Sequence, residues 1–185
     1  MHFIRTQLGR QKAFNNFNFR FFSGGQFGAT YGLEHALWFA PEGVIDVFSW
    51  RRSTDFDHVG EEAKAVREGV GLLETSNFAK YMITGSDAAE WLDTMLACRI
   101  PPVGRMTLAP MLKHDGKVIG DFSLSRLDDE TFLIIGSGIA ENYHMRWFIS
   151  QLPEGADIEV SSLGLGLTGL SIAGPNARDV LAAIT

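Results

Sequence analysis

A single carboxylate interrupts an apolar stretch near the middle of the chain. Asp121 follows Val118-Ile119-Gly120 and precedes Phe122-Ser123-Leu124, a pattern that favours a β-strand, although Asp is depleted inside strands. In one interpretation its side chain lies on the solvent face or caps a neighbouring loop, which the cost of burying an unpaired carboxylate favours. In the other, it lies on the wall of a cavity, where it would transfer a proton or bind a cationic ligand.

The other reactive side chains give weaker signals. Cys98 is the single cysteine of the chain and follows an amphipathic helical segment, which is typical of a small buried hydrophobic residue. A nucleophilic cysteine would need a nearby base, and the sequence offers none at a recognisable spacing. The five histidines form no H-x-x-x-H pair, so we expect no metal site, and we expect His114 to be an exposed hairpin residue.

Residues 164–169 spell the G-x-G-x-x-G pattern of dinucleotide-binding loops. That mechanism needs a helix directly after the glycines and an acidic residue about 20 positions further on. Leu170-Ser171-Ile172-Ala173 instead continues as a strand. The glycine pattern therefore does not predict a nucleotide site.

The elements that would position Asp121 are strands in the middle of the chain. Apolar runs at 106–112 and 117–124 flank Asp115-Gly116, which is a strong hairpin signal. A third, buried strand is expected at 131–135, so that the three form an antiparallel meander. Further strands are expected at 44–48, 78–84, 158–160 and 167–173.

Helices are expected between these strands. Residues 57–69 should form one, with Val59, Ala63 and Val66 as its apolar stripe. Ser86 should cap a second helix that runs through Leu96. Others are expected at about 140–151 and after Gly174-Pro175. This order predicts an α+β fold with mixed or antiparallel sheets and flanking helices.

Composition excludes several classes of protein. The 185 residues suffice for one ordinary domain, and the formal net charge is -6. An acidic body argues against nucleic-acid binding, and no apolar run approaches the roughly 20 residues of a membrane span. Residues 1–30 lack acidic groups and are rich in Phe, Asn and Gly, so we expect an atypical, partly disordered lead-in before a domain at 31–185. A single cysteine indicates a reducing compartment.

Several segments, taken in order, resemble the folate-binding aminomethyltransferase family. This family includes the T-protein of the glycine cleavage system and the C-terminal halves of dimethylglycine and sarcosine dehydrogenases. The similar segments are 62–73, 76–81, the hairpin segment 111–122 and the strand-to-helix turn at 170–178. Segments 31–41 and 141–147 are closer to the dehydrogenase branch, although Leu33 and His35 replace its usual Trp and Arg.

The resemblance implies a tetrahydrofolate-dependent transfer of a one-carbon unit from an aminomethyl group or from the iminium of an N-methyl amine. Asp121 matches the family's active-site carboxylate. The positions that match folate-binding residues are Phe78, Met106, Leu108, Ile135 and Gly136, with Met106 where the T-protein branch often has Tyr. Nothing in the chain resembles an FAD site. We expect a cytoplasmic location, or the mitochondrial matrix in a eukaryote.

Family domains are much longer than this chain, so the resemblance implies that the C-terminal half of the fold is missing. Two alternatives to the transfer reaction follow. The chain could be a non-catalytic assembly piece that pairs with itself or with a partner subunit that completes the fold. It could also resemble a folate-dependent demethylase, which would form 5-methyltetrahydrofolate instead of the methylene form.

Overall fold

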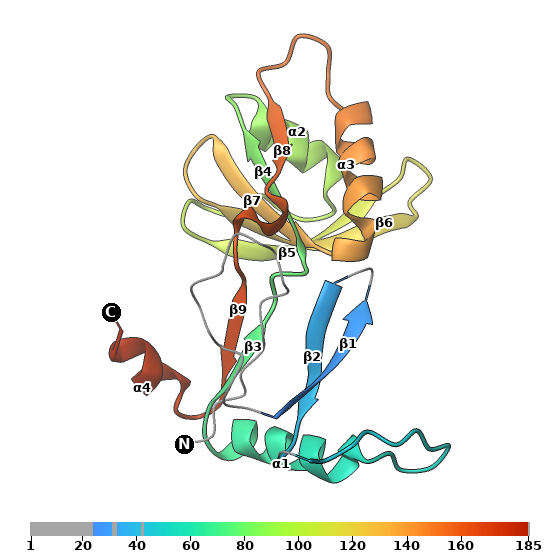
Figure 1. The fold of residues 1–185 in the computed structure, drawn as a ribbon. Coiled ribbons are helices and arrows are strands. Elements are labelled where there is room, and N and C mark those ends of the chain that lie inside the picture. The colour runs from blue at the N-terminus through green and yellow to red at the C-terminus, as the bar shows by residue number, and fades with distance from the viewer. Residues whose placement is uncertain (1–23, 31–32, 42, 185) are drawn as a thin grey trace. The chain divides into compact units, whose positions relative to one another are not determined.

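The computed structural model describes residues 24–30, 33–41 and 43–184. The chain forms two compact units (Figure 1). Unit 1 comprises Met1–Thr75 and Leu170–Thr185, and unit 2 comprises Ser76–Gly169. Among the described residues, no helix is both long and apolar enough to cross a membrane.

Unit 2 contains one antiparallel sheet of five strands in the order β5-β6-β7-β4-β8. Its strands are β4 (Ala79–Thr84), β5 (Met106–Leu112), β6 (Val118–Arg126), β7 (Thr131–Gly136) and β8 (Glu159–Ser162). Its helices are α2 (Ala88–Met95) and α3 (Glu141–Ser150), with short 3₁₀ turns η2 (Gly138–Ala140) and η3 (Gly164–Gly166). The predicted meander is therefore confirmed as β5-β6-β7.

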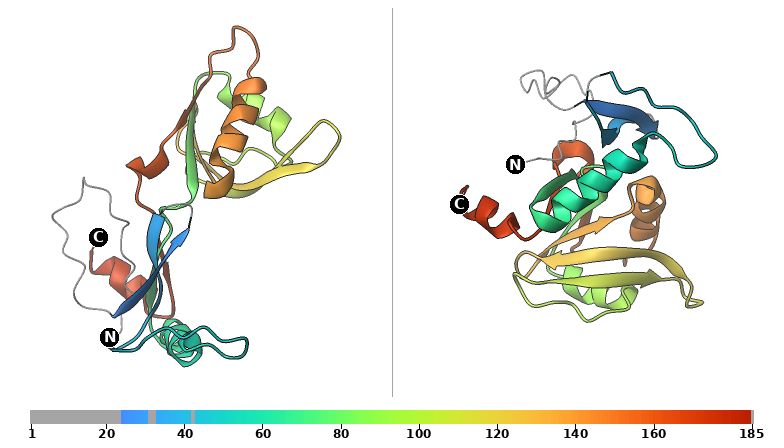
Figure 2. Two further views of the ribbon diagram at one scale, coloured as in Figure 1. Left: turned by 45° about the vertical axis from the view of Figure 1, so that its right-hand side comes forward. Right: turned by 90° about the horizontal axis from the view of Figure 1, so that it is seen from below.

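The β5–β6 hairpin forms where the sequence predicts it. Gly116 has a φ of 81°, a left-handed conformation that glycine adopts without steric cost. The Asp115 carboxylate accepts a hydrogen bond from the Lys117 backbone N–H, which closes the turn locally. The loop of this hairpin projects from the sheet (Figure 2).

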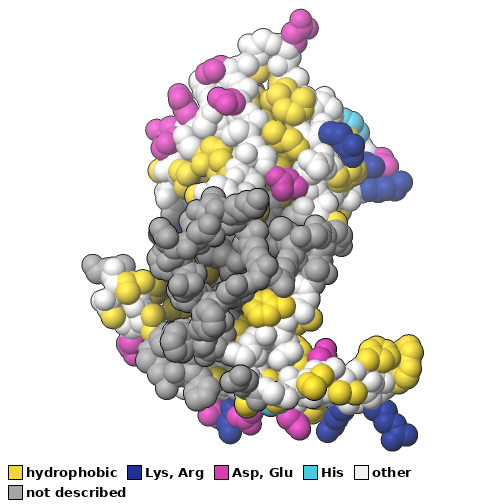
Figure 3. Space-filling model, in the orientation of Figure 1, with side chains coloured by type: hydrophobic (Ala, Val, Ile, Leu, Met, Phe, Trp, Pro, Cys, Tyr) yellow, Lys and Arg dark blue, Asp and Glu magenta, His cyan; other side chains and the backbone are white. Residues whose placement is uncertain are grey.

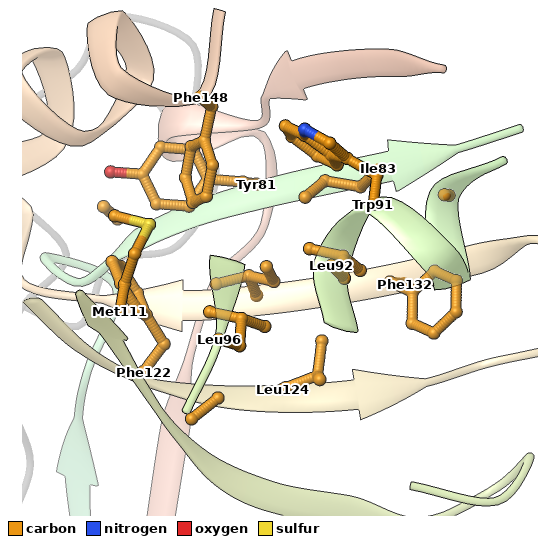
Figure 4. Close-up of a cluster of buried hydrophobic side chains, with 14 residues drawn as sticks. Tyr81, Ile83, Trp91, Leu92, Leu96, Met111, Phe122, Leu124, Phe132 and Phe148 are labelled. Carbon is orange, nitrogen blue, oxygen red and sulfur yellow. The ribbon is translucent and has the colours of Figure 1, made fainter. Parts of the chain in front are cut away.

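Strand alternation gives the sheet an inner face, which we define as the face packed against α2 and α3. Tyr81 and Ile83 of β4 are fully buried on this face, as are Phe132 and Ile134 of β7. Their side chains meet Trp91, Leu92 and Phe148 of the two helices and complete one hydrophobic cluster (Figure 4). Burial of this apolar surface is the main force that holds unit 2 together.

The opposite, outer face carries the alternate residues of the same strands. These are Met106, Leu108 and Pro110 of β5, Asp121, Ser123 and Ser125 of β6, Leu133 and Ile135 of β7, and Lys80 and Met82 of β4. Most of them are half-buried or exposed. Neither α2 nor α3 covers this face (Figures 1 and 2).

Unit 1 contains two short antiparallel pairs. Strand β1 (Gly25–Thr30) pairs with β2 (Leu33–Phe39), and β3 (Gly71–Glu74) pairs with β9 (Leu170–Ala173). Helix α1 (Asp55–Glu68) contacts β2, where the Glu62 carboxylate accepts a hydrogen bond of 2.7 Å from the Phe39 N–H. Helix α4 (Ala177–Ala182) follows β9.

Four expectations about local structure are wrong. Residues 44–48 form no strand, because no described segment pairs with them, and Ile45 and Phe48 are exposed. Helix α1 buries none of its residues, and Val59 of the expected stripe is 40% exposed. Ser86 does not cap α2, because its hydroxyl donates to the Asp157 carboxylate instead.

The fourth concerns the lead-in. Residues 25–30, within the segment expected to be irregular, form β1. Residues 1–23 of that segment lie outside the described residues.

Candidate functional site

The Asp121 side chain lies on the outer face of the unit 2 sheet. It is the fourth residue of β6, and it is exposed while Phe122 beside it is buried. Its cross-strand partner on β5 is Pro110. Within the described part of the chain, no hydrogen bond or ion pair occupies its carboxylate. The Asp121 side chain is therefore exposed to solvent, and its carboxylate is free to accept a hydrogen bond or a proton. Its catalytic role stays a prediction.

Three of the predicted folate-binding residues share this face. Leu108 lies opposite Ser123, Ser123 opposite Ile135, and Ile135 opposite Lys80, so that one row crosses four strands. Met106 belongs to the next row, opposite Ser125. Leu108 is 76% exposed and Met106 is 65% exposed. The register thus gathers a carboxylate and three apolar side chains, far apart in sequence, on one surface.

Gly136 and Phe78 lie elsewhere. Gly136 is buried on the inner face, where the Phe122 ring fills the space that a Cβ would need. Phe78 directly precedes β4 and is 46% exposed. The structure gives Gly136 a packing role, and a folate contact from either residue stays a prediction.

Lys80 is a buried charged residue on the outer face that the sequence pattern did not single out. Its side chain is almost fully buried at 3% exposure, although it belongs to the outer face. Its ammonium donates hydrogen bonds to the carbonyl oxygens of Ser76, Phe78 and Gly164, at 2.8, 2.9 and 3.3 Å. The sequence held a signal for this residue, because lysine is also depleted inside strands, although less than aspartate.

The Lys80 hydrogen bonds also explain the glycine pattern at 164–169. Gly164 begins the 3₁₀ turn η3, and its carbonyl is held at the start of β4 by the Lys80 ammonium. Strand β9 follows the last glycine without a helix. The pattern therefore builds a loop for Lys80, and the nucleotide interpretation finds no support.

His144 lies on the inner side of β6, behind Asp121. Its ring is 2% exposed, and its Nε2 is 3.3 Å from the carbonyl oxygen of Ile119. Burial lowers the pKa of this imidazole, since desolvation penalises the charged form. In the sequence His144 stands out only within the family-like segment 141–147 and in the test for histidine pairs, because nothing local links it to β6.

Cys98 does not have the surroundings of a nucleophile. It is half-buried and packs against the hydrophobic cluster of unit 2. Burial, and to a lesser degree the negative charge of Asp93, raises the pKa of its thiol. The unreactive thiol form is therefore favoured, as expected for a structural cysteine.

Two further features lie apart from the outer face. A cavity of about 340 Å³ opens at the C-terminal end of α2, beside His114 and Trp147, and no predicted site residue lines it. No group of three or more His, Cys, Asp or Glu side chains that could hold a metal ion occurs among the described residues. His114 is exposed, as predicted.

Known proteins resemble this chain along most of its length. Residues 22–185 match the family described as GCVT N-terminal domain. Dimethylglycine dehydrogenase, mitochondrial, from Homo sapiens is 33% identical over 161 residues, which cover 85% of this chain and 19% of that protein. Sarcosine oxidase subunit alpha from Corynebacterium sp. (strain U-96) is 32% identical over 151 residues, which cover 74% of this chain and 16% of that protein. The chain thus spans about a fifth of the length of these relatives, or less.

A solved structure has the same fold. The glycine cleavage system aminomethyltransferase T from Bartonella henselae matches with a TM-score of 0.70 and 21% identity, over 86% of this chain and 40% of that chain. The predicted α+β fold is confirmed. The predicted resemblance, including its dehydrogenase branch, is confirmed by the relatives.

Proposed function

The chain belongs to the GCVT N-terminal domain family, and we propose that the outer face of its unit 2 sheet binds tetrahydrofolate and serves one-carbon transfer. The observation that supports this most directly is the shared face of Asp121, Met106, Leu108 and Ile135, four of the six residues that the family resemblance nominates. Of the five nominated residues that lie in strands, Gly136 alone points to the inner face, since neighbours in a strand point in opposite directions.

The residues present fit such a ligand. The aryl extension of tetrahydrofolate is flat and apolar, whereas its pterin ring carries several hydrogen-bonding groups. Leu108 and Ile135, the neighbours of Ser123 in one row of the sheet, offer apolar contact to the aryl part. Asp121 lies two residues before Ser123 on the same face of β6, and its carboxylate adds a strong hydrogen-bond acceptor. Sites for small ligands commonly combine apolar contacts with a few fixed polar groups.

Tetrahydrofolate, when bound, supplies the two nitrogens that take up the one-carbon unit. In our proposal Asp121 accepts a proton from the reacting nitrogen or stabilises the positive charge that develops beside it. Its exposure on the outer face keeps the carboxylate accessible for this role. The donor would be a small N-methyl amine, as its iminium, or an aminomethyl group.

The test uses the full chain, tetrahydrofolate and formaldehyde, which has the required oxidation level. Calorimetry should detect tetrahydrofolate binding, and Asp121→Ala should weaken it about tenfold, since a hydrogen bond to a charged group is lost. Formation of 5,10-methylenetetrahydrofolate above the uncatalysed rate should fall about 100-fold, as for a lost general base. Identification of 5-methyltetrahydrofolate as the product of a methyl donor would indicate the demethylase instead.

Glu130→Gln is the matched control, because it also removes one exposed negative charge from unit 2, in the turn before β7. It should change neither binding nor rate. No binding by the folded chain, or binding equal in wild type and Asp121→Ala, would contradict the proposed site.

A second candidate function is self-association, and exposed apolar side chains of unit 1 favour it. The loop between β2 and α1 exposes Ile45, Val47, Phe48 and Trp50, the last to 94%. Hydrophobic side chains lie next to basic ones at the end of this loop (Figure 3). Exposed aromatic and arginine residues are frequent in protein interfaces. Light scattering can test this at a protein concentration of about 100 μM, which is well above the dissociation constants of stable dimers. A monodisperse monomer at this concentration would rule out self-association.

A further inference from the structure

The contacts of His144 converge on the segment of β6 that carries Asp121. Its Nε2 faces the Ile119 carbonyl oxygen at 3.3 Å, and its ring lies edge-to-face against Phe122 at 4.8 Å between centroids. Between these two residues, a Cβ built on Gly120 would lie 2.6 Å from Nε2. The imidazole therefore contacts the backbone or side chains on both sides of Asp121 from beneath.

The strand is irregular at this point. Met111 of β5 pairs with Gly120, and Leu112 pairs with Val118, so Ile119 has no partner on β5. This is a β-bulge, in which one extra residue bends the strand and redirects the neighbouring side chains. A bulge also releases a backbone carbonyl from the regular ladder, and the His144 Nε2 lies where it can bind that carbonyl.

This contact selects one form of the ring. A carbonyl oxygen can only accept, so Nε2 must carry the proton that it donates. Nδ1 is then unprotonated in the neutral ring, and it is buried without a hydrogen-bond partner among the described residues. A buried acceptor without a partner is rare in folded proteins and calls for an explanation.

We propose that His144 is a positioning residue for Asp121: it holds the bulged Ile119 carbonyl and supports Gly120 and Phe122, so that the carboxylate is fixed toward the outer face. The role of Asp121 in folate chemistry rests on the proposed function, whereas the support of the bulge does not. His144 itself contacts no ligand in this proposal, because its ring lies on the inner side of β6.

Burial favours a neutral His144 ring, and the nearby negative charge acts against it. Asp121 is the charged group that acts on it from β6 and opposes the effect of burial, which lowers its pKa. From β4, the Tyr81 ring packs on Phe122 and stays neutral, because burial raises its pKa. Glu141 and Arg146 lie on His144's own helix. Below the ordinary pKa of histidine the unfolded chain takes up a proton that the fold resists, so stability should fall as the pH drops.

The experiment compares three substitutions in the full chain. His144→Phe keeps the ring shape and removes the donor. His144→Gln can place its amide N–H near the position of Nε2, whereas His144→Asn reaches only about as far as Nδ1. His114→Gln, in the exposed hairpin loop, is the control for losing an imidazole in unit 2.

The first readout needs no ligand. Amide hydrogen exchange at Gly120 and Asp121 should become at least tenfold faster in His144→Phe and His144→Asn, while exchange in β7 stays unchanged. His144→Gln should remain within threefold of wild type. If His144→Phe does not fold, Gln and Asn still decide the question: equal exchange at Gly120 in the two variants would overturn the proposal.

The second readout separates positioning from binding. With tetrahydrofolate and formaldehyde, His144→Phe should lower kcat about tenfold while the dissociation constant of tetrahydrofolate changes less than threefold. His144→Gln should restore kcat. It should also lack the decline of kcat that we expect for wild type when the ring is protonated at low pH. An unchanged kcat in His144→Phe would overturn the proposal. If wild type binds no tetrahydrofolate, the proposed function fails, and the exchange data still test the bulge.

Discussion

The inner and outer faces of the unit 2 sheet are built from alternate residues of the same strands, and they differ in what contacts them. Inner-face residues such as Phe132 and Leu124 are fully buried against α2 and α3. On the outer face Leu108 is 76% exposed, and it shares that face with Asp121. Burial on the inner face holds the fold together, whereas the outer face leaves the Leu108 and Asp121 side chains accessible.

Lys80 and His144 are polar side chains buried on opposite faces of this sheet. Lys80 belongs to the outer face and is buried by its hydrogen bonds to three carbonyls of neighbouring loops. His144 belongs to the inner side and binds the backbone beneath Asp121. Both side chains stabilise backbone that regular strand pairing leaves without partners.

The largest difference in stability between the two faces should come from substituting Phe132 and Leu133, which are neighbours in β7. Phe132→Ala removes a fully buried ring from the hydrophobic cluster, so the free energy of unfolding should fall by about 3–5 kcal/mol. Leu133→Ala, one residue along on the half-buried outer face, should cost less than about 1.5 kcal/mol. Urea unfolding of both variants measures the two values. Equal losses would show that the outer face is also part of the core.

A smaller loss in the free energy of unfolding is expected when Gly120 is replaced by alanine. In Gly120→Ala the new methyl group would lie 2.6 Å from His144 Nε2 and 2.9 Å from the Phe122 ring, and both rings are buried. Overpacking of this kind should lower the free energy of unfolding by about 1–3 kcal/mol.

Gly166→Ala is the matched control for this change, because nothing lies within 4 Å of a Cβ at that position. It should shift the free energy of unfolding by less than about 0.5 kcal/mol. Thermal unfolding of the pair gives the comparison. If Gly120→Ala is as stable as Gly166→Ala, then His144 is not held against β6 as described.

The sequence predicted the β5-β6-β7 meander because its signals are local. Asp115-Gly116 fixes the hairpin between two apolar runs, and a third apolar run follows at β7. Local sequence signals gave wrong predictions where the structure depends on contacts with residues far away in the sequence. Residues 44–48 have the composition of a strand but no partner, and Ser86 binds Asp157, 71 positions away, instead of capping α2.

The candidate site was predicted only in part for the same reason. Asp121 was found because a carboxylate is unusual inside an apolar strand, and the resemblance nominated Leu108 and Ile135. Their common row follows from the pairing of β5, β6 and β7, which single-strand patterns do not specify. The role of His144 depends on a bulge, and a bulge exists only once two strands are paired in register.

The smallest effect on stability, and the most informative about function, is expected at Leu108. Because the side chain is 76% exposed, Leu108→Ala should change the free energy of unfolding by less than about 0.5 kcal/mol. If tetrahydrofolate binds on the outer face, the same substitution removes apolar contact with the ligand and should weaken binding about three- to tenfold. Calorimetry and urea unfolding on one preparation measure both quantities.

Val118 at the start of β6 is the control, because it is 65% exposed and has no predicted ligand role. Val118→Ala should leave both the binding of tetrahydrofolate and the free energy of unfolding unchanged. Weakened binding without a loss of stability would separate the ligand-binding face from the face that holds the fold, whereas unchanged binding would place the ligand elsewhere.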